Sequence, residues 1–160
     1  MEEQARFLAL VHEHRRIVHR IAGLYATDPD DRKDLEQETL LQAWRGWHTF
    51  RGDAKFSTWL YRIALNTALS WTRRSRIVQR MGDREVPEPG DDSPIAHADE
   101  RQRLHAAMLL LPETDRALVA LHLDGFDHNE IAGMLGLTAN NVGVKLHRIK
   151  ARLTEILKPL

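Results

Sequence analysis

The segment that most constrains the fold is residues 82–96, which read GDREVPEPGDDSPIA. It holds three prolines and two glycines, a density of breakers that neither a helix nor a strand tolerates. Its charges are mostly acidic, so we expect an extended, solvated tether. The sequence therefore predicts two small units, residues 1–80 and 97–160, joined by a flexible acidic linker at 81–96.

Both units have the periodicity of helices, and neither has the alternating pattern of a β-strand, so the predicted fold is all-α. Asp28 can cap a helix that begins at Pro29 and is expected to reach about residue 47. Ser57 can cap another, expected over residues 58–76. Before them, apolar side chains at mostly three- and four-residue steps predict one N-terminal helix: Phe7, Leu10, Val11, Ile17, Val18, Ile21 and Leu24.

Residues 127–153 have the order of a helix-turn-helix: a short helix, a tight turn and a longer helix. Asp127 followed by Glu130 resembles a capping box, Gly136 allows a sharp turn, and Thr138 can cap the second helix. Apolar residues then recur at steps of four, three and four on one face: Val142, Leu146, Ile149 and Leu153. In DNA-binding proteins the second helix of this motif enters the major groove.

The second helix also carries side chains whose chemistry suits base edges and phosphates. They are Asn140, Asn141, Lys145, His147, Arg148 and Arg152. An ordinary helical hairpin with a solvated basic face would show the same spacing, so this pattern leaves both interpretations open.

The distribution of charge favours a nucleic-acid partner although the formal net charge is zero. Residues 51–80 contain seven bases and one acid, and residues 139–160 contain five bases and one acid. The acidic segment between them cancels these patches in the sum. A phosphate backbone responds to the local field, so the two patches remain candidate contacts.

Aromatic and basic residues alternate in residues 50–74, FRGDAKFSTWLYRIALNTALSWTRR. Aromatic faces can stack on unpaired bases while cations follow the phosphates, as single-strand binding requires. The aromatics, Phe50, Phe56, Trp59, Tyr61 and Trp71, could equally belong to the core. Asn66, one turn beyond Arg62, is more indicative because its amide can hydrogen-bond a base edge.

These motifs together resemble extracytoplasmic-function sigma factors, the smallest class of the sigma-70 superfamily. Residues 50–68 resemble the family's promoter-melting segment, and residues 34–38 (DLEQE) with 43–45 (AWR) resemble the preceding polymerase-binding segment. Further matches to the C-terminal domain lie at residues 111–113 (LPE), 125–126 (GF), 130–132 (EIA) and 142–148 (VGVKLHR).

The resemblance implies that the N-terminal unit binds the clamp helices of the largest subunit of RNA polymerase. The implied contact residues are Asp34, Gln37, Glu38, Leu41 and Trp44. The same carboxylates would also be favourable near a helix start without any partner. The resemblance further implies that the C-terminal unit reads the −35 element and contacts the flap of the second-largest subunit.

The resemblance also implies that the N-terminal unit recognises and melts the −10 element. Phe50, Arg51, Gly52, Asp53 and Lys55 would form a loop that receives a flipped base, and Trp59, Arg62 and Asn66 would lie beside it. Arg73, Arg74 and Arg76 would meet duplex phosphates upstream. The sequence departs from the family at Leu40, where many members carry an aromatic, and at Gly143, where many carry a larger polar residue.

The resemblance implies control by a separate anti-sigma factor, the usual controller in this family where no C-terminal regulatory extension is expected. The acidic start, Met1-Glu2-Glu3-Gln4, and the lack of a long apolar run suggest neither a signal peptide nor membrane insertion, which suits the cytoplasm. The chain has no cysteine. No cofactor, metal site or catalytic residue is expected, since HExxH, P-loop and GxSxG motifs are missing from the sequence.

Two other classes of protein fit parts of the sequence. An enzyme would have to use the nine histidines or the carboxylates, but His12 and His14 are two apart and cannot share a helix face. A free-standing helix-turn-helix regulator would explain residues 127–153 but not residues 50–74 or the DLEQE segment. Such regulators usually dimerise, and the sequence has no dedicated dimerisation heptad.

Overall fold

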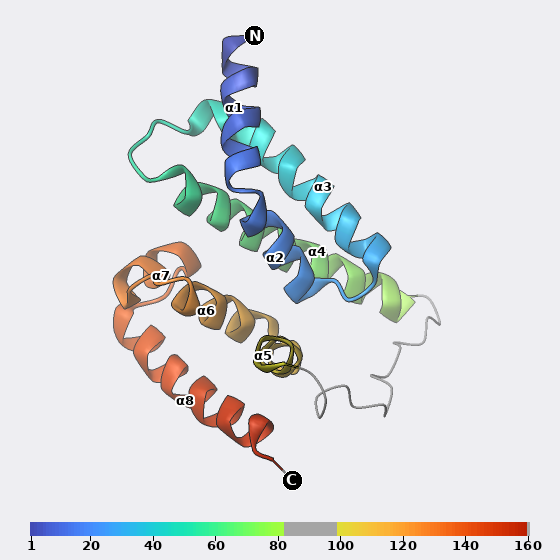
Figure 1. Cartoon of the computed structure of the whole chain (residues 1–160), viewed down its shortest axis with the longest axis vertical. Coiled ribbons are helices and arrows are strands. Elements are labelled where there is room, and N and C mark those ends of the chain that lie inside the picture. The colour runs from blue at the N-terminus through green and yellow to red at the C-terminus, as the bar shows by residue number, and fades with distance from the viewer. Residues whose placement is uncertain (82–98, 160) are drawn as a thin grey trace. The chain divides into compact units, whose positions relative to one another are not determined.

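The computed structural model describes residues 1–81 and 99–159. The chain divides into two compact units, Met1–Glu85 and Val86–Leu160. Every regular element of the described residues is a helix, which confirms the all-α prediction (Figure 1). The predicted acidic linker, apart from Met81, lies outside the described residues. Over the ranges 1–81 and 99–159, no helix has the length and apolar character needed to cross a membrane.

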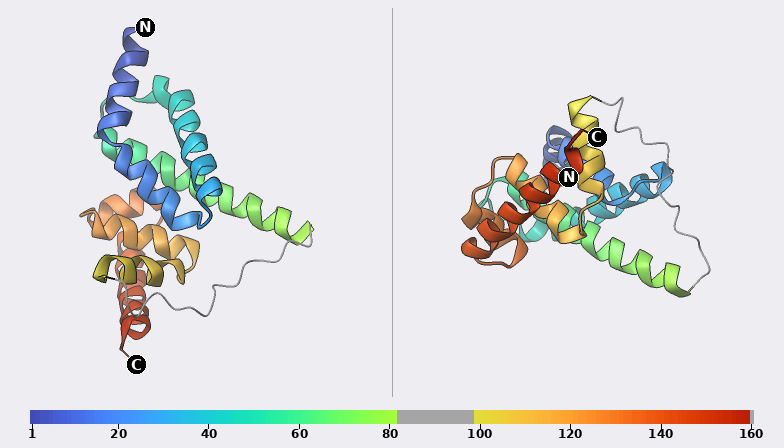
Figure 2. Two further views of the ribbon diagram at one scale, coloured as in Figure 1. Left: turned by 45° about the vertical axis from the view of Figure 1, so that its right-hand side comes forward. Right: turned by 90° about the horizontal axis from the view of Figure 1, so that it is seen from below.

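The first unit consists of α1 (Glu2–Glu13), α2 (Arg15–Tyr25), α3 (Pro29–Gly46), the 3-10 helix η1 (Trp47–Thr49) and α4 (Phe56–Met81). Helices α2, α3 and α4 pack pairwise into a bundle. The C-terminal half of α4 runs on past the ends of α2 and α3 (Figure 2). This extension carries the cations of residues 73–76 away from the bundle core.

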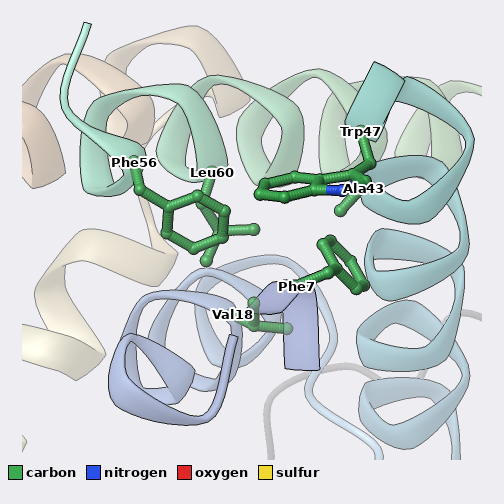
Figure 3. Packing of buried hydrophobic residues seen from close by; sticks show 6 residues of the cluster. All are labelled: Phe7, Val18, Ala43, Trp47, Phe56 and Leu60. Atoms are coloured by element: carbon green, nitrogen blue, oxygen red, sulfur yellow. The ribbon is translucent and has the colours of Figure 1, made fainter. Parts of the chain in front are cut away.

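The prediction of one continuous N-terminal helix is wrong, because α1 and α2 are separated at His14, whose φ is −107° and ψ 19°. The step from Val11 to Ile17 is six residues, which does not keep both on one face of a helix with 3.6 residues per turn. The break turns the chain so that Phe7 and Val18 point into the same core (Figure 3).

The predicted start of α3 is confirmed, since the Asp28 side chain accepts a hydrogen bond from the backbone N–H of Asp30 at 3.2 Å. The prediction that Ser57 caps the next helix is wrong. The carbonyl of Lys55 already accepts a helical bond from the N–H of Trp59 at 3.1 Å, so Ser57 lies in the first turn. The first residue of the helix, Phe56, is buried in the core of the first unit.

An aromatic cluster holds the first unit together (Figure 3). The indole of Trp47 lies at its centre, with ring centroids 5.3 Å from Phe7, 5.5 Å from Phe50 and 6.2 Å from both Phe56 and Trp59. Since these residues come from α1, η1, the loop after it and α4, one cluster fixes the position of the loop relative to three helices.

The second unit consists of α5 (Glu100–Leu109), α6 (Glu113–Leu123), α7 (His128–Leu135) and α8 (Ala139–Leu157). Helix α8 packs against the other three. Its buried side chains are Val142, Leu146, Ile149 and Leu153, the inward face that the spacing predicted. The Arg116 guanidinium donates hydrogen bonds of 2.8 Å to the carbonyls of Leu109 and Leu111 and so caps the end of α5.

The helix-turn-helix has the predicted capping residues and the predicted glycine turn. Asp127 accepts from the N–H of Glu130 at 2.8 Å and caps α7. Gly136 takes a left-handed conformation, with φ 70° and ψ 34°, which costs a residue with a Cβ atom about 1–2 kcal/mol. Thr138 then accepts from the N–H of Asn141 at 3.1 Å and caps α8.

Candidate polymerase and nucleic-acid interfaces

The five residues expected to bind polymerase form one stripe along α3. Asp34, Gln37, Glu38, Leu41 and Trp44 follow a spacing of three, one, three and three, which keeps them on one helix face. The opposite face is buried through Leu35, Thr39 and Ala43. We call this stripe the α3 surface.

The α3 surface is mixed in character, with acids toward its N-terminal end and apolar side chains toward its C-terminal end. Leu41 is 42% exposed and Trp44 is 44% exposed, so two large apolar side chains lie close together on this face. The Trp44 ring packs on one side against Phe7, with ring centroids 5.1 Å apart. The other side of this indole faces the solvent.

The loop expected to receive a flipped base is held at both ends by rings. Phe50 and Phe56 meet edge to face with centroids 5.7 Å apart, and Phe50 also lies 5.3 Å from Trp59. The five residues between the two phenylalanines, residues 51–55, are all exposed. Gly52 among them has φ 81°, and a methyl group added to it would meet no neighbouring atom within 4 Å, so backbone conformation alone selects glycine there.

The sequence left open whether the aromatic residues of α4 belong to the core, and the structure places them in or near it. Tyr61 is buried and Trp71 half-buried, whereas Arg62 and Asn66 are exposed on the helix. The half-buried Trp59 joins the aromatic cluster while part of its ring remains accessible. The three arginines expected to meet duplex phosphates are all exposed: Arg73, Arg74 and Arg76.

A groove of about 400 Å³ lies between α3 and α4. It brings Glu38 of the α3 surface together with two residues expected to contact −10 DNA, Asn66 and Arg74. Gln42 and Ser70 also line it, and sequence reasoning missed both. The steps of four from Asn66 to Ser70 to Arg74 were the available signal, since they place the three on one face of α4.

On the second unit, the exposed face of α8 contains a residue that sequence reasoning also missed. Val144 lies one turn after Asn140 and one turn before Arg148, and it is 44% exposed. Asn140, Asn141, His147, Arg148 and Arg152 are accessible as expected, whereas Lys145 is half-buried. The middle of the outward face is therefore apolar and its surroundings are polar or basic.

A second groove, of about 420 Å³, lies on this face of α8. We call it the α8 groove; it is lined by His128, Ala139, Asn140, Gly143, Val144, His147 and Arg148. His128, the first residue of α7, forms a wall opposite Gly143: a methyl group added to Gly143 would lie 3.5 Å from the imidazole.

Two titratable groups that flank the turn between α6 and α7, His122 and Asp127, have lowered pKa values. Burial lowers the pKa of His122 below its ordinary value, and the charges of Lys150 and His128 lower it further. The backbone hydrogen bond from Glu130 holds the pKa of Asp127 below its usual range, which keeps this cap anionic at the start of α7. Helix α8 has no acid before Glu155, so its exposed face from residue 139 to residue 154 is basic or neutral.

Comparison with known proteins identifies this arrangement. Residues 10–77 match the family described as Sigma-70 region 2, and residues 101–153 match Sigma-70, region 4. The chain belongs to the extracytoplasmic-function class of the sigma-70 family. This confirms the membership that the sequence motifs predicted, and the protein is an RNA polymerase sigma factor.

Several curated sigma factors are similar over nearly the whole chain. The ECF RNA polymerase sigma factor SigM of Mycobacterium tuberculosis is 32% identical over 94% of this chain and 76% of its own length. The RNA polymerase sigma-E factor of Streptomyces coelicolor is 30% identical over 98% of this sigma factor and 89% of its own length.

The fold is likewise that of solved sigma factors. The sigma factor RpoE of Bartonella quintana, solved in complex with the anti-sigma factor NepR, superposes with a TM-score of 0.71 at 22% identity. The superposition covers 96% of this sigma factor and 95% of that chain. The two family matches and the curated relatives, which span both units, disfavour a free-standing helix-turn-helix regulator.

Proposed function

We propose that this sigma factor divides promoter recognition among three surfaces: the α3 surface for core polymerase, residues 50–76 for the −10 element, and the exposed face of α8 for the −35 element. The observation that carries this division is the segregation of side-chain chemistry. Acids and exposed apolar groups share the α3 surface, whereas α4 beyond residue 56 and α8 before residue 155 carry cations and amides without acids.

The α3 surface suits a protein partner better than DNA. Asp34 and Glu38 would repel phosphates, whereas Leu41 and Trp44 offer the exposed apolar area that protein interfaces bury at their centre. The family relationship makes the clamp helices of the largest polymerase subunit the expected partner. By the same relationship, the second unit would also contact the flap of the second-largest subunit.

The loop at residues 51–55 suits a flipped base because its frame is rigid. Extruding one base from a duplex costs a few kcal/mol, and a preorganised site offsets that cost better than a mobile one. The aromatic cluster supplies the rigidity, while Arg51 and Lys55 are available for the phosphates on either side. Asn66, exposed on α4, would read a neighbouring base, and Arg73, Arg74 and Arg76 would hold the upstream duplex.

The exposed face of α8 suits the major groove of the −35 element. Its amide and guanidinium groups match base edges and phosphates, and the helix-turn-helix geometry directs the start of the second helix into the groove. We propose Asn140, Asn141, His147, Arg148 and Arg152 as contacts, with the half-buried Lys145 reaching the backbone at the edge.

We also propose that the sigma factor works in the cytoplasm, has no catalytic centre of its own, and is held inactive by an anti-sigma factor. Bond formation then belongs to the polymerase. Support for the last partner comes from the solved complex of RpoE with NepR. Affinity capture from the native organism, followed by mass spectrometry, should recover a protein that blocks polymerase binding.

Transcription by a reconstituted holoenzyme tests the function. Core RNA polymerase receives a pool of genomic promoter fragments with and without the sigma factor, and the transcript starts are sequenced. We expect discrete new starts that share two spaced upstream elements. No new starts, from protein shown by circular dichroism to be helical, would refute the proposal.

A further inference from the structure

The exposed face of α8 carries an apolar side chain among the residues proposed to contact DNA. Val144 is 44% exposed and lies between Asn140 and Arg148, one turn from each. Single exposed apolar side chains are common on protein surfaces, so it is the surroundings of this valine that indicate a contact.

The surroundings of Val144 form a shallow, open groove of about 420 Å³. Val144, Gly143 and Ala139 contribute only aliphatic or backbone atoms to the α8 groove, and His128 walls it from α7. A methyl on Gly143 would lie in ordinary contact with the His128 ring at 3.5 Å, but a longer side chain would have to enter the groove. Glycine at 143 thus keeps the groove open beside Val144.

The rim of the α8 groove indicates what occupies it. Asn140, His147 and Arg148 surround the apolar floor, and no acid lines the groove. A basic and amide rim around an apolar floor is complementary to the major groove of DNA. The one apolar group that base pairs expose there is the C5-methyl of thymine.

Resting on the −35 role proposed above, we propose that Val144 and the α8 groove select thymine at one position of the −35 element by packing against its C5-methyl. Asn140, one turn earlier on the same face, is placed to contact an adjacent base pair, and its amide suits adenine. Gly143 and His128 act as positioning residues, since they shape the groove without supplying its apolar contact.

Removing single methyl groups from promoter DNA tests this selection. In a −35 element identified by the holoenzyme transcription experiment, each thymine of either strand is replaced in turn by deoxyuridine, which lacks only the C5-methyl. Holoenzyme affinity is measured by competition. We expect one position at which the loss is about fourfold, the value for one buried methylene-sized group.

Two test variants, each with a control substitution, connect that thymine position to the α8 groove. Val144→Ser should bind the thymine promoter less tightly and become indifferent to deoxyuridine at that position. Gly143→Gln, which fills the groove, should also abolish the methyl dependence, whereas Gly143→Ala should retain it. Ala151→Ser adds the same hydroxyl to the exposed face of α8 outside the groove and should retain the dependence too.

The outcomes distinguish failure of the Val144 assignment from failure of the proposed sigma-factor function. A holoenzyme that initiates normally but is insensitive to every methyl removal, or that selects a −35 element without thymine on either strand, overturns the Val144 assignment alone. Sensitivity that persists in Val144→Ser overturns it as well. Failure to initiate at any promoter overturns the proposed function together with it.

Discussion

The Phe50 ring meets the Phe56 ring edge to face, with centroids 5.7 Å apart and planes at 86°. These two residues bracket the exposed residues 51–55, so their contact closes the loop proposed to receive a flipped base. Edge-to-face pairs contribute about 0.5–1.5 kcal/mol beyond burial of their area. The same contact thus links the stability of the first unit to the geometry of its DNA-binding loop.

Phe56→Ala should destabilise the first unit by about 3 kcal/mol, since it empties a buried ring site within the aromatic cluster. Urea unfolding followed by tryptophan fluorescence measures the change, because Trp47 and Trp59 lie against this ring. Phe56→Leu should lose clearly less. An unchanged unfolding midpoint in Phe56→Ala would show that the ring is not part of the core.

Asp34→Arg combined with Glu38→Arg should weaken binding to core RNA polymerase by at least tenfold while the protein stays folded. Both side chains belong to the α3 surface and neither is buried, so charge reversal acts on the partner rather than on the core. Fluorescence anisotropy of labelled sigma factor with core polymerase, without DNA, gives the affinity.

The matched control for that pair is Glu2→Arg with Glu3→Arg, which makes the same change of charge on exposed residues of α1. It should bind polymerase nearly as the unmodified protein does. Equal affinity of the two double variants would remove the α3 surface from the interface.

Asn66→Ala should alter the preference for −10 bases more than the preference for −35 bases. Its amide is exposed on α4 and lines the groove that also contains Arg74. Transcription from promoter libraries randomised at one element at a time measures both preferences. Asn140→Ala is the reciprocal control and should change the −35 profile alone; a uniform loss over all promoter variants in Asn66→Ala would contradict base reading.

Arg148→Ala should weaken promoter binding and make its salt dependence shallower. Each phosphate contact contributes about 0.9 to the slope of log affinity against log salt concentration, so the slope should fall by about that amount. Arg101→Ala removes an equally exposed arginine from α5 and should leave the slope unchanged. The same slope in both variants would mean that Arg148 touches no phosphate.

The second unit should lose stability as the pH falls below about 6.5, the ordinary pKa of histidine, because of His122. Burial, Lys150 and His128 lower the pKa of this imidazole in the folded state, so the unfolded chain takes up a proton that the folded chain does not. The free energy of unfolding must then decrease until the pH reaches the folded-state pKa. His122→Asn should flatten this part of the pH profile, measured by urea unfolding; an identical profile would exclude His122 as the cause.

The sequence alone determined the features that arise from local chemistry. Asp28, Asp127 and Thr138 cap helices because a short oxygen-bearing side chain satisfies an amide of the first turn, whatever the rest of the fold does. Gly136 marks a turn for the equally local reason that a Cβ atom is strained at positive φ. Family membership followed from the order and spacing of several such motifs.

Only the tertiary structure decided where the chain changes direction between helices and which aromatic side chains are buried. Periodicity cannot show a change of direction, so it missed the break at His14, which follows from bringing Phe7 and Val18 into one core. It cannot tell a core aromatic from a surface one either, and packing buries Tyr61 while leaving Trp44 half outside. The α8 groove depends on the close approach of His128 to the backbone of Gly143, fifteen positions away in another helix. Distant parts of the chain meet through packing, and packing is set by the whole core rather than by any local run of residues.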